Sequence, residues 1–426
     1  MPDRRPLEAT DYILVAIICG LMGAFYWAIR GTGGFGGAAG GALAGFGWAL
    51  LWHAFSHSDG AGEHRPYSHA WMVWAITLGI AFGGLTGYGV YTAWVRGTFY
   101  LDYPGGVREV GAWTGYAMLF VCGLHWGGNT GCFMAWCAPG RPVRGRDWLL
   151  RIACGVAGAV AAGIVVRVFP QLFLPFYGEG LYQVEANATC QRAVGSIHNI
   201  AWHVGLFLGF LGYEIGRRDW RAVGMILVLA LGFAIPFAVG GAWHTMHGSE
   251  LKIGWWKNWE MTIGLGGGLA FGLAFFLFNR PAAASRPALG AKSRAFFASY
   301  FPFWLPALIV CFSVYDGLSN LHGFERTAAG HIIILVLLTA VVGATAWRRI
   351  QQTKGQQNAR FRLPFPEILA FQALIIAAGY LTSIPGDELR LANKVLLVLY
   401  TIYIGCSCAL AFLLYRRRQT SSPRQA

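Results

Sequence analysis

Apolar stretches of about 20 residues recur along the chain from Tyr12 to Tyr415, and each is long enough to cross the hydrocarbon core of a bilayer. The segments that connect them are too short to fold as separate soluble domains. The composition agrees, because 56% of the residues are hydrophobic and only 12% are charged, whereas about 25% are charged in ordinary soluble domains. The sequence therefore predicts an all-α polytopic membrane protein and excludes a soluble enzyme.

Charged residues, prolines and polar clusters divide the apolar sequence into about twelve predicted transmembrane helices. Their expected ranges are 12–29, 34–55, 69–95, 111–137, 149–169, 196–215, 222–243, 259–278, 301–319, 329–346, 366–383 and 394–415. The first range is too long for the core of a signal peptide, so we expect it to remain as a membrane helix. The cysteines are scattered, several of them within these ranges, and we expect no structural disulfide.

Basic residues are concentrated in alternate connecting segments. If the N-terminus is cytoplasmic, the segments assigned to the inside hold 22 of the 33 Lys and Arg residues, and the external segments hold nine. Cytoplasmic loops of membrane proteins carry such an excess of positive charge. The pattern predicts a multi-pass protein of the cell (inner) membrane with both termini in the cytoplasm. Orientation in the lipid bilayer thus accounts for the net charge of +14, and we expect no nucleic-acid partner.

Glycine content divides the chain into two parts, since 50 of the 59 glycines precede residue 281. We expect residues 1–280 to form a glycine-rich eight-helix membrane core of four helical hairpins. Residues 281–300 are predicted to be a cytoplasmic linker. Residues 301–415 are predicted to be a four-helix membrane bundle that serves as scaffold or as a homo-oligomerisation surface. Residues 416–426 then form a basic cytoplasmic tail.

Two observations favour a degenerate hairpin repeat in the first eight helices. The second helix of each predicted hairpin carries small residues at short spacing, and Arg146-Asp147-Trp148 recurs as Arg218-Asp219-Trp220. Small residues four apart let helix backbones approach closely in lipid, so tight packing is the simplest role of these glycines. The other interpretation is a broken helix that lines a binding cavity, for which residues 31–41, with seven glycines, are the best candidate.

Polar side chains at membrane depth are costly unless they face a protein interior or water, so they are the default candidates for a binding site. His125 and Asn129 lie four residues apart, on one face near the middle of the fourth predicted helix. The remaining candidates lie near the predicted external ends of their helices and are Arg30, Asn199, Trp202, His203, Trp243, His244, Lys257 and Glu260. We predict that these ten residues bind a substrate. Alternatively, each satisfies a helix end or sits among lipid headgroups.

We expect no bound cofactor. His244 and His247 have a spacing that can chelate zinc, but no HExxH motif or CxxC pair supplies further ligands. Haem held between His125 and His203 is the other alternative, although the sequence lacks a covalent attachment motif. The histidine-rich loop at residues 53–69 permits weak metal binding or pH sensing, and we interpret it as a solvated connector.

The favoured function is a secondary transporter, coupled to an ion or proton gradient, for a small polar or anionic solute. About twelve helices, internal repeats and glycine-interrupted spans are typical of that class. Arg30 would attract an anionic group, His125 and Asn129 would hydrogen-bond the solute, and His203 or His244 would carry a coupled proton. The alternative is a membrane-embedded group transferase that acts on a lipid-linked or anionic substrate at a histidine-rich outer site. The sequence contains no acidic pair or nucleophile motif that supports it.

The charge pattern makes a direct prediction about sidedness. Single cysteines placed in residues 141–147, 281–294 and 351–361 of a cysteine-free variant should react with an impermeant thiol reagent only from the cytoplasm. Cysteines in residues 176–190 and 248–256 should react from outside, because those segments lie on the side with fewer basic residues. Labelling of the first group from outside would contradict the twelve-helix topology.

Overall fold

The computed structural model describes residues 7–31, 37–59, 61–101, 106–183, 188–249, 253–281, 301–322, 365–383 and 391–420, with a few single positions between 332 and 363. The helices are α1 (Ala9–Arg30), α2 (Gly37–Ser56), α3 (Trp71–Gly83), α4 (Tyr91–Val95), α5 (Ala112–Cys137), α6 (Gly145–Val168), α7 (Ala188–Gly216), α8 (Trp220–Gly240), α9 (Trp255–Phe278), α11 (Phe301–His322), α13 (Phe365–Ser383) and α14 (Leu391–Thr420). Short 3-10 turns are formed by Ala61–His64, Pro170–Leu172, Tyr177–Glu179, Leu181–Gln183 and Gly241–Met246. One antiparallel hairpin pairs β1 (Thr98–Leu101) with β2 (Gly106–Glu109).

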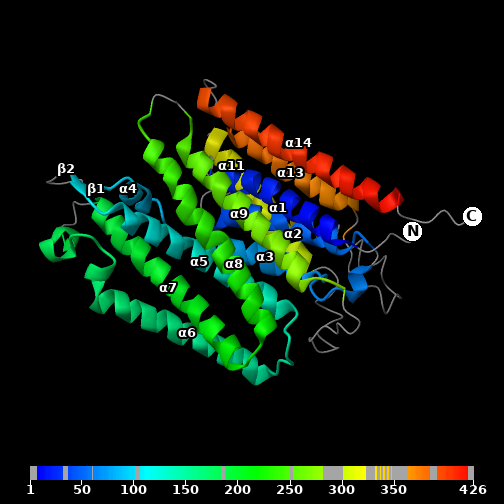
Figure 1. Cartoon of the computed structure of the whole chain (residues 1–426), viewed down its shortest axis with the longest axis horizontal. Coiled ribbons are helices and arrows are strands. Elements are labelled where there is room, and N and C mark those ends of the chain that lie inside the picture. Colours follow the sequence, from blue (N-terminus) through cyan, green and yellow to red (C-terminus); the bar gives the residue numbers. More distant parts are fainter. Residues whose placement is uncertain are drawn as a thin grey trace, which may run out of the picture.

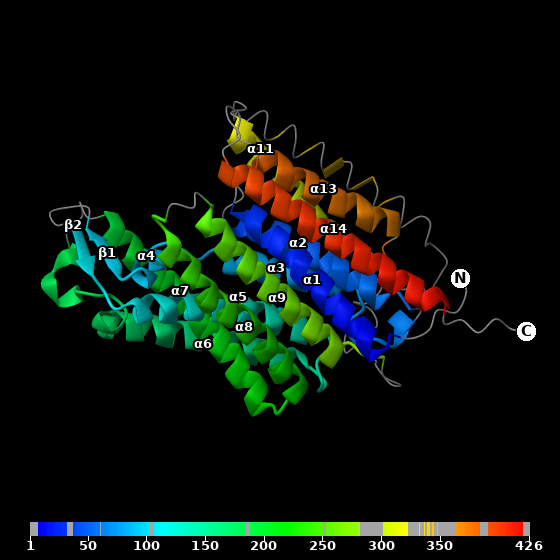
Figure 2. The same cartoon turned by 45° about the horizontal axis from the view of Figure 1, so that its top comes forward.

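Seven of the described helices are long and apolar enough to cross a membrane, namely α1, α6, α7, α8, α9, α13 and α14. They run side by side in a bundle (Figures 1 and 2), as expected for an all-α membrane protein. The predicted helix at 329–346 falls almost entirely outside the described residues. The count of twelve spans therefore stays a prediction.

The predicted span 69–95 is wrong as a single helix. α3 has 13 residues, or about 20 Å at 1.5 Å per residue, which is shorter than the hydrocarbon core. The residue after α3, Gly84, packs closely on α2, since an added Cβ would be 2.3 Å from the carbonyl oxygen of Gly37. The Thr86 hydroxyl then donates to the Gly83 carbonyl at the end of α3. The turn brings Thr86 and Tyr88 into the protein interior.

Two pairs of helices lie at opposite sides of the bundle. α13 and α14 lie along one side of α1, whereas α6 and α7 lie at the opposite side of the bundle (Figures 1 and 2). Tyr26 of α1 donates to the Gln372 side chain at 2.6 Å, which joins α1 to α13. Arg417 donates to the Thr10 hydroxyl at 2.8 Å, so the start of α1 and the end of α14 lie at the same end of the bundle.

Glycines allow the closest helix contacts. A Cβ at Gly264 or Gly268 of α9 would lie 2.0 Å from a backbone carbonyl oxygen of α1. A Cβ at Gly127 would lie 2.0 Å from the Leu229 carbonyl, and one at Gly209 would lie 2.1 Å from the Cys154 carbonyl. Tight packing is therefore what these glycines provide. They join α1 to α9, α5 to α8 and α6 to α7, and of these only α6 and α7 follow one another in the chain.

The recurring Arg-Asp-Trp triplet begins two helices in different ways. Asp219 is the N-cap of α8 and accepts from the backbone N–H of Ala222 at 3.1 Å. Asp147 instead lies inside the first turn of α6 and accepts from the backbone N–H of Arg144 at 2.6 Å. Both acidic residues stabilise a helix N-terminus. The triplets thus share a capping role, and the repeat itself stays a prediction.

The loop at residues 53–69 is a buried junction, which corrects its interpretation as a solvated connector. Asp59 and Arg65 form an ion pair with fully buried side chains. Arg65 also donates to the backbone carbonyl of Asn279 at 2.6 Å, and the Asn279 amide donates to the Ser56 hydroxyl at 2.9 Å. A buried charge needs such partners. The loop therefore fastens α2 to the end of α9.

Substitution of a contact glycine should destabilise the protein. Gly268→Leu places a side chain where the α1 backbone lies, and overpacking of this kind costs about 1–3 kcal/mol or more. Gly212→Leu is the matched control, because a Cβ at Gly212 meets no atom within 4 Å. The measurement is the thermal unfolding of both variants in the same detergent. Equal stability of the two variants would contradict the packing role of Gly268.

Candidate functional site

A buried polar cluster lies between α5, α7 and the turn that follows α3. His125 and Asn129 of α5 are completely buried, and the centroid of the His125 ring is 5.4 Å from that of His203 on α7. The Asn129 amide donates to the backbone carbonyls of His125 at 3.0 Å and His203 at 3.2 Å. Thr86, in the break after α3, lies 3.3 Å from His125 Nε2. The Asn129 amide thus joins α5 to α7 through the backbone carbonyl of His203.

Three buried atoms of this cluster have no hydrogen-bond partner among the described residues: His125 Nδ1, Asn129 Oδ1 and His203 Nε2. An unsatisfied buried polar group costs about 1–3 kcal/mol. Most native structures satisfy nearly all such groups. The three atoms lie on two neighbouring helices of the described structure.

Arg30 is buried at the end of α1 within a box of aromatic rings. Its guanidinium carbon lies 4.7 Å from the centroid of Trp27, 5.0 Å from that of Trp126 and 5.5 Å from that of Tyr88. Cation–π contacts of this kind stabilise a cation that has lost its water. Trp126 is the next residue after His125, so the aromatic box adjoins the polar cluster.

Glu260 and Lys257 of α9 lie beside this box. Lys257 Nζ donates to Glu260 Oε2 at 2.6 Å and to the Ala28 carbonyl at 2.8 Å. Glu260 interacts electrostatically with Arg30. Glu260 also lies close to Gly31, the residue after Arg30, because a Cβ at Gly31 would be 2.1 Å from Glu260 Oε1. Two cations and one carboxylate therefore meet where α1 ends, which favours an anionic group of a solute.

His244 and Trp243 lie beyond α8, next to the start of α9. His244 is buried, and its ring centroid is 4.8 Å from that of Trp259 and 5.3 Å from that of Trp256. Trp259 in turn lies 5.4 Å from the Tyr88 ring, which borders Arg30. His244 therefore connects to the aromatic box through two rings. Trp243 is exposed and stacks on Trp255 at 5.8 Å, so it forms an outer rim.

The structure brings most of the sequence-based candidates into one continuous region, namely Arg30, His125, Asn129, His203, His244, Lys257 and Glu260. Asn199 and Trp202 do not join it. The Asn199 side chain is exposed, and only its backbone carbonyl contacts His203. Trp202 is 45% exposed and faces α6, since a Cβ at Gly163 would lie 3.7 Å from its indole nitrogen. Both point away from the cluster because they lie on other faces of α7.

Sequence reasoning missed a second buried charge cluster. Arg151 Nε lies 2.5 Å from Glu214 Oε1, and both side chains are fully buried between α6 and α7. Trp136 also donates to Glu214 Oε1 at 3.2 Å, and the Trp148 ring lies 4.7 Å from the Arg151 guanidinium carbon. The signal was present, because an Arg and a Glu inside two successive apolar helices are costly unless they meet.

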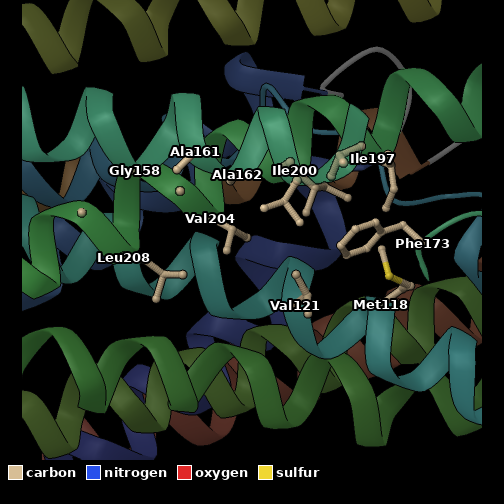
Figure 3. A pocket seen from close by; sticks show the side chains of 15 residues that line it. Met118, Val121, Gly158, Ala161, Ala162, Phe173, Ile197, Ile200, Val204 and Leu208 are labelled. Atoms are coloured by element: carbon tan, nitrogen blue, oxygen red, sulfur yellow. The ribbon is translucent and has the colours of Figure 1, made fainter. Parts of the chain in front are cut away.

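An apolar cavity of about 550 Å³ lies between α5, α6 and α7 (Figure 3). Val121, Ile200 and Val204 are among its lining side chains, all of which are apolar. Val121 precedes His125 by about one helical turn, so the cavity approaches the polar cluster but contains none of its side chains. Its lining suits a hydrocarbon chain and offers no hydrogen bond to a polar solute.

Among the residues that the structure describes, no three His, Cys, Asp or Glu side chains gather as a metal-binding group. The nine cysteines are free. The expectation of no cofactor stays a prediction. Comparisons with known protein families, with curated proteins and with solved structures found no match to this chain.

The Arg151–Glu214 pair makes a prediction about stability. Arg151→Met should cost about 3–5 kcal/mol, because it leaves the buried Glu214 carboxylate without its cation. The double variant Arg151→Met/Glu214→Leu should recover most of that loss. Chemical unfolding of the variants in detergent measures both effects.

A matched control is the pair between Arg108 and Glu179, whose side chains are 39% and 48% exposed. Arg108→Met should cost at most about 1 kcal/mol, since water screens an exposed pair. If the double variant at Arg151 and Glu214 is less stable than Arg151→Met alone, the unpaired Glu214 carboxylate is not the source of the loss and our expectation is wrong.

Proposed function

We propose that the protein is a multi-pass secondary transporter that carries a small polar or anionic solute, driven by an ion or proton gradient. The observation that carries the proposal is the set of buried, unpartnered polar atoms on His125, Asn129 and His203. Their free-energy cost is offset when a solute binds. A transporter must hold such a solute near the middle of the membrane.

The geometry around Arg30 supports an anionic group on the solute. Burial of a guanidinium among aromatic rings is costly, and a bound anion offsets that cost. In the proposed topology the protein lies in the inner membrane with both termini in the cytoplasm. This topology agrees with the distribution of basic residues. His203 and His244 are the groups that we propose for the coupled proton.

A membrane-embedded group transferase is the less favoured function. The outer histidine, His244, packs against Trp256 and Trp259. A general base needs a substrate proton within hydrogen-bond reach and, for covalent catalysis, a nucleophile beside it. Among the residues that the structure describes, no Ser, Thr or Cys side chain is hydrogen-bonded to His244. Turnover without net flux across a vesicle membrane would support the transferase instead.

The proposal predicts separable effects on folding and on binding. His125→Ala and Asn129→Ala should leave the protein folded but abolish its thermal stabilisation by the solute, because both side chains supply hydrogen bonds to that solute. The solute is first found by a thermal-stability screen of small anions, sugars, nucleobases and metal ions in lipid nanodiscs. Flux of the stabilising compound into proteoliposomes, with and without an ion gradient, then tests transport.

Asn199→Ala is the matched control for this experiment, because the Asn199 side chain is exposed outside the cluster. It should keep both binding and flux. Normal flux in both His125→Ala and Asn129→Ala would place the functional centre elsewhere. Misfolding of both variants would identify the cluster as a structural hydrogen-bond network.

A further inference from the structure

The contact with Thr86 decides which ring nitrogen of His125 donates and which accepts. A hydroxyl has one hydrogen, and that of Thr86 points to the Gly83 carbonyl at 2.8 Å. Toward His125 Nε2, at 3.3 Å, the Thr86 oxygen can therefore only accept. Nε2 carries the ring hydrogen, and in the neutral imidazole the unpartnered Nδ1 is an acceptor.

The unpartnered atoms of His203 and Asn129 are acceptors as well. His203 Nδ1 lies 2.7 Å from the Asn199 carbonyl, so it carries the hydrogen and the unpartnered Nε2 of the neutral ring is an acceptor. The Asn129 amide nitrogen faces two carbonyls, which fixes the orientation of the amide and leaves Oδ1 as an acceptor. The carbonyl of Phe82 also lies beside the His203 ring. This half of the site, the acceptor cluster, thus presents acceptors.

The half around Arg30, the donor cluster, has the opposite character. Trp27 Nε1, Arg30 Nε and Trp126 Nε1 are buried without a partner in the described part of the chain. Indole and guanidinium nitrogens only donate. The Trp27 and Trp126 ring centroids are 4.8 Å apart, and the Arg30 guanidinium lies within 5.0 Å of both, so the three donors belong to one group.

We infer that the solute is a zwitterion, whose protonated amine binds in the acceptor cluster and whose carboxylate binds in the donor cluster. The inference rests on the proposed function and names its substrate class. A primary ammonium group has three N–H donors for the three acceptors, and a carboxylate only accepts.

A divalent metal ion is a poorer occupant of the acceptor cluster. His125, His203 and Asn129 are neutral ligands, and no carboxylate or thiolate among the described residues joins them in a metal-binding group. Arg30, whose guanidinium carbon lies 5.0 Å from the Trp126 centroid, adds further positive charge to the region. Two positive charges would therefore be buried without a counter-charge, which is strongly unfavourable.

The distances place the two clusters next to each other. The centroids of His125 and Trp126 are 6.5 Å apart, and the Arg30 guanidinium carbon lies 5.0 Å from the Trp126 centroid. Trp126 belongs to the donor cluster and directly follows His125 of the acceptor cluster in the chain. A series of amino acids of increasing length therefore tests which separation of amine and carboxylate fits the two clusters.

Calorimetry on the full chain in lipid nanodiscs tests the inference. The ligands are glycine, β-alanine, 4-aminobutyrate and 6-aminohexanoate, with butyrate and butylamine as analogues that lack one charged group. At least one of the amino acids should bind roughly tenfold to a hundredfold more tightly than both analogues, because each analogue leaves one cluster unpaired. If butyrate binds as tightly as every amino acid, the zwitterion inference is overturned while the proposed transport of anions stands.

Two variants at one position separate the amine contact from folding. Asn129→Leu should remove the preference for the amino acid over butyrate, because it deletes an acceptor at nearly constant shape. Asn129→Asp should keep or increase that preference, because it retains an acceptor and adds negative charge next to the amine. Loss of the preference in both folded variants would overturn the inference.

Two further results would distinguish failure of the zwitterion inference from failure of the proposed transport function. Binding of Zn²⁺ that is lost in His125→Ala, together with no binding of any amino acid, would identify a metal site and overturn the zwitterion. If Arg30→Met leaves the binding of every ligand unchanged and no ligand enters proteoliposomes, the proposed function falls as well.

Discussion

The backbones of α1 and α9 touch along a row of glycines, and the buried site depends on that contact. A Cβ at Gly264 or at Gly268 would collide with a carbonyl of α1 at 2.0 Å. In lipid, no expulsion of water presses helices together, so close packing of this kind drives their association. The contact fixes the height of α9 along α1. As a result Lys257 reaches the Ala28 carbonyl and Glu260 lies against the backbone beside Arg30.

The break after α3 has a comparable effect on the other half of the site. A continuous helix would carry residues 84–90 straight on, and Thr86 would not turn back onto the Gly83 carbonyl. The turn instead places Thr86 against His125 and Tyr88 against Arg30. One short helix therefore supplies contacts to both the acceptor cluster and the donor cluster, which a full-length span could not do.

The sequence predicted the ends of the long helices well where apolar runs stop at charges, as at Arg30 and just before Arg280. It also found His125, Asn129 and Arg30, because an ionisable or amide side chain inside an apolar run has few explanations. It missed the pairing of Arg151 with Glu214, since partners 63 residues apart on different helices carry no local pattern.

Other errors have the same origin. The break after α3 lies at the contact between Gly84 and Gly37, and glycine alone does not distinguish a close contact from a turn. Asn199 and Trp202 were assigned to the site by their distance along the helix, whereas rotation about α7 decides which neighbour each side chain meets. That rotation is set by Gly205 and Gly209 against α6.

The junction between Arg65 and Asn279 also bears on the order in which the protein is made. Arg65, Tyr67 and Ser56 are all synthesised more than 200 residues before Asn279, their hydrogen-bond partner. While the ribosome is still translating the intervening helices, these polar groups lack that partner. The contacts that join the first two helices to Asn279 therefore form only after α9 has left the ribosome, so assembly includes a docking step between distant parts of the chain rather than a strictly sequential one.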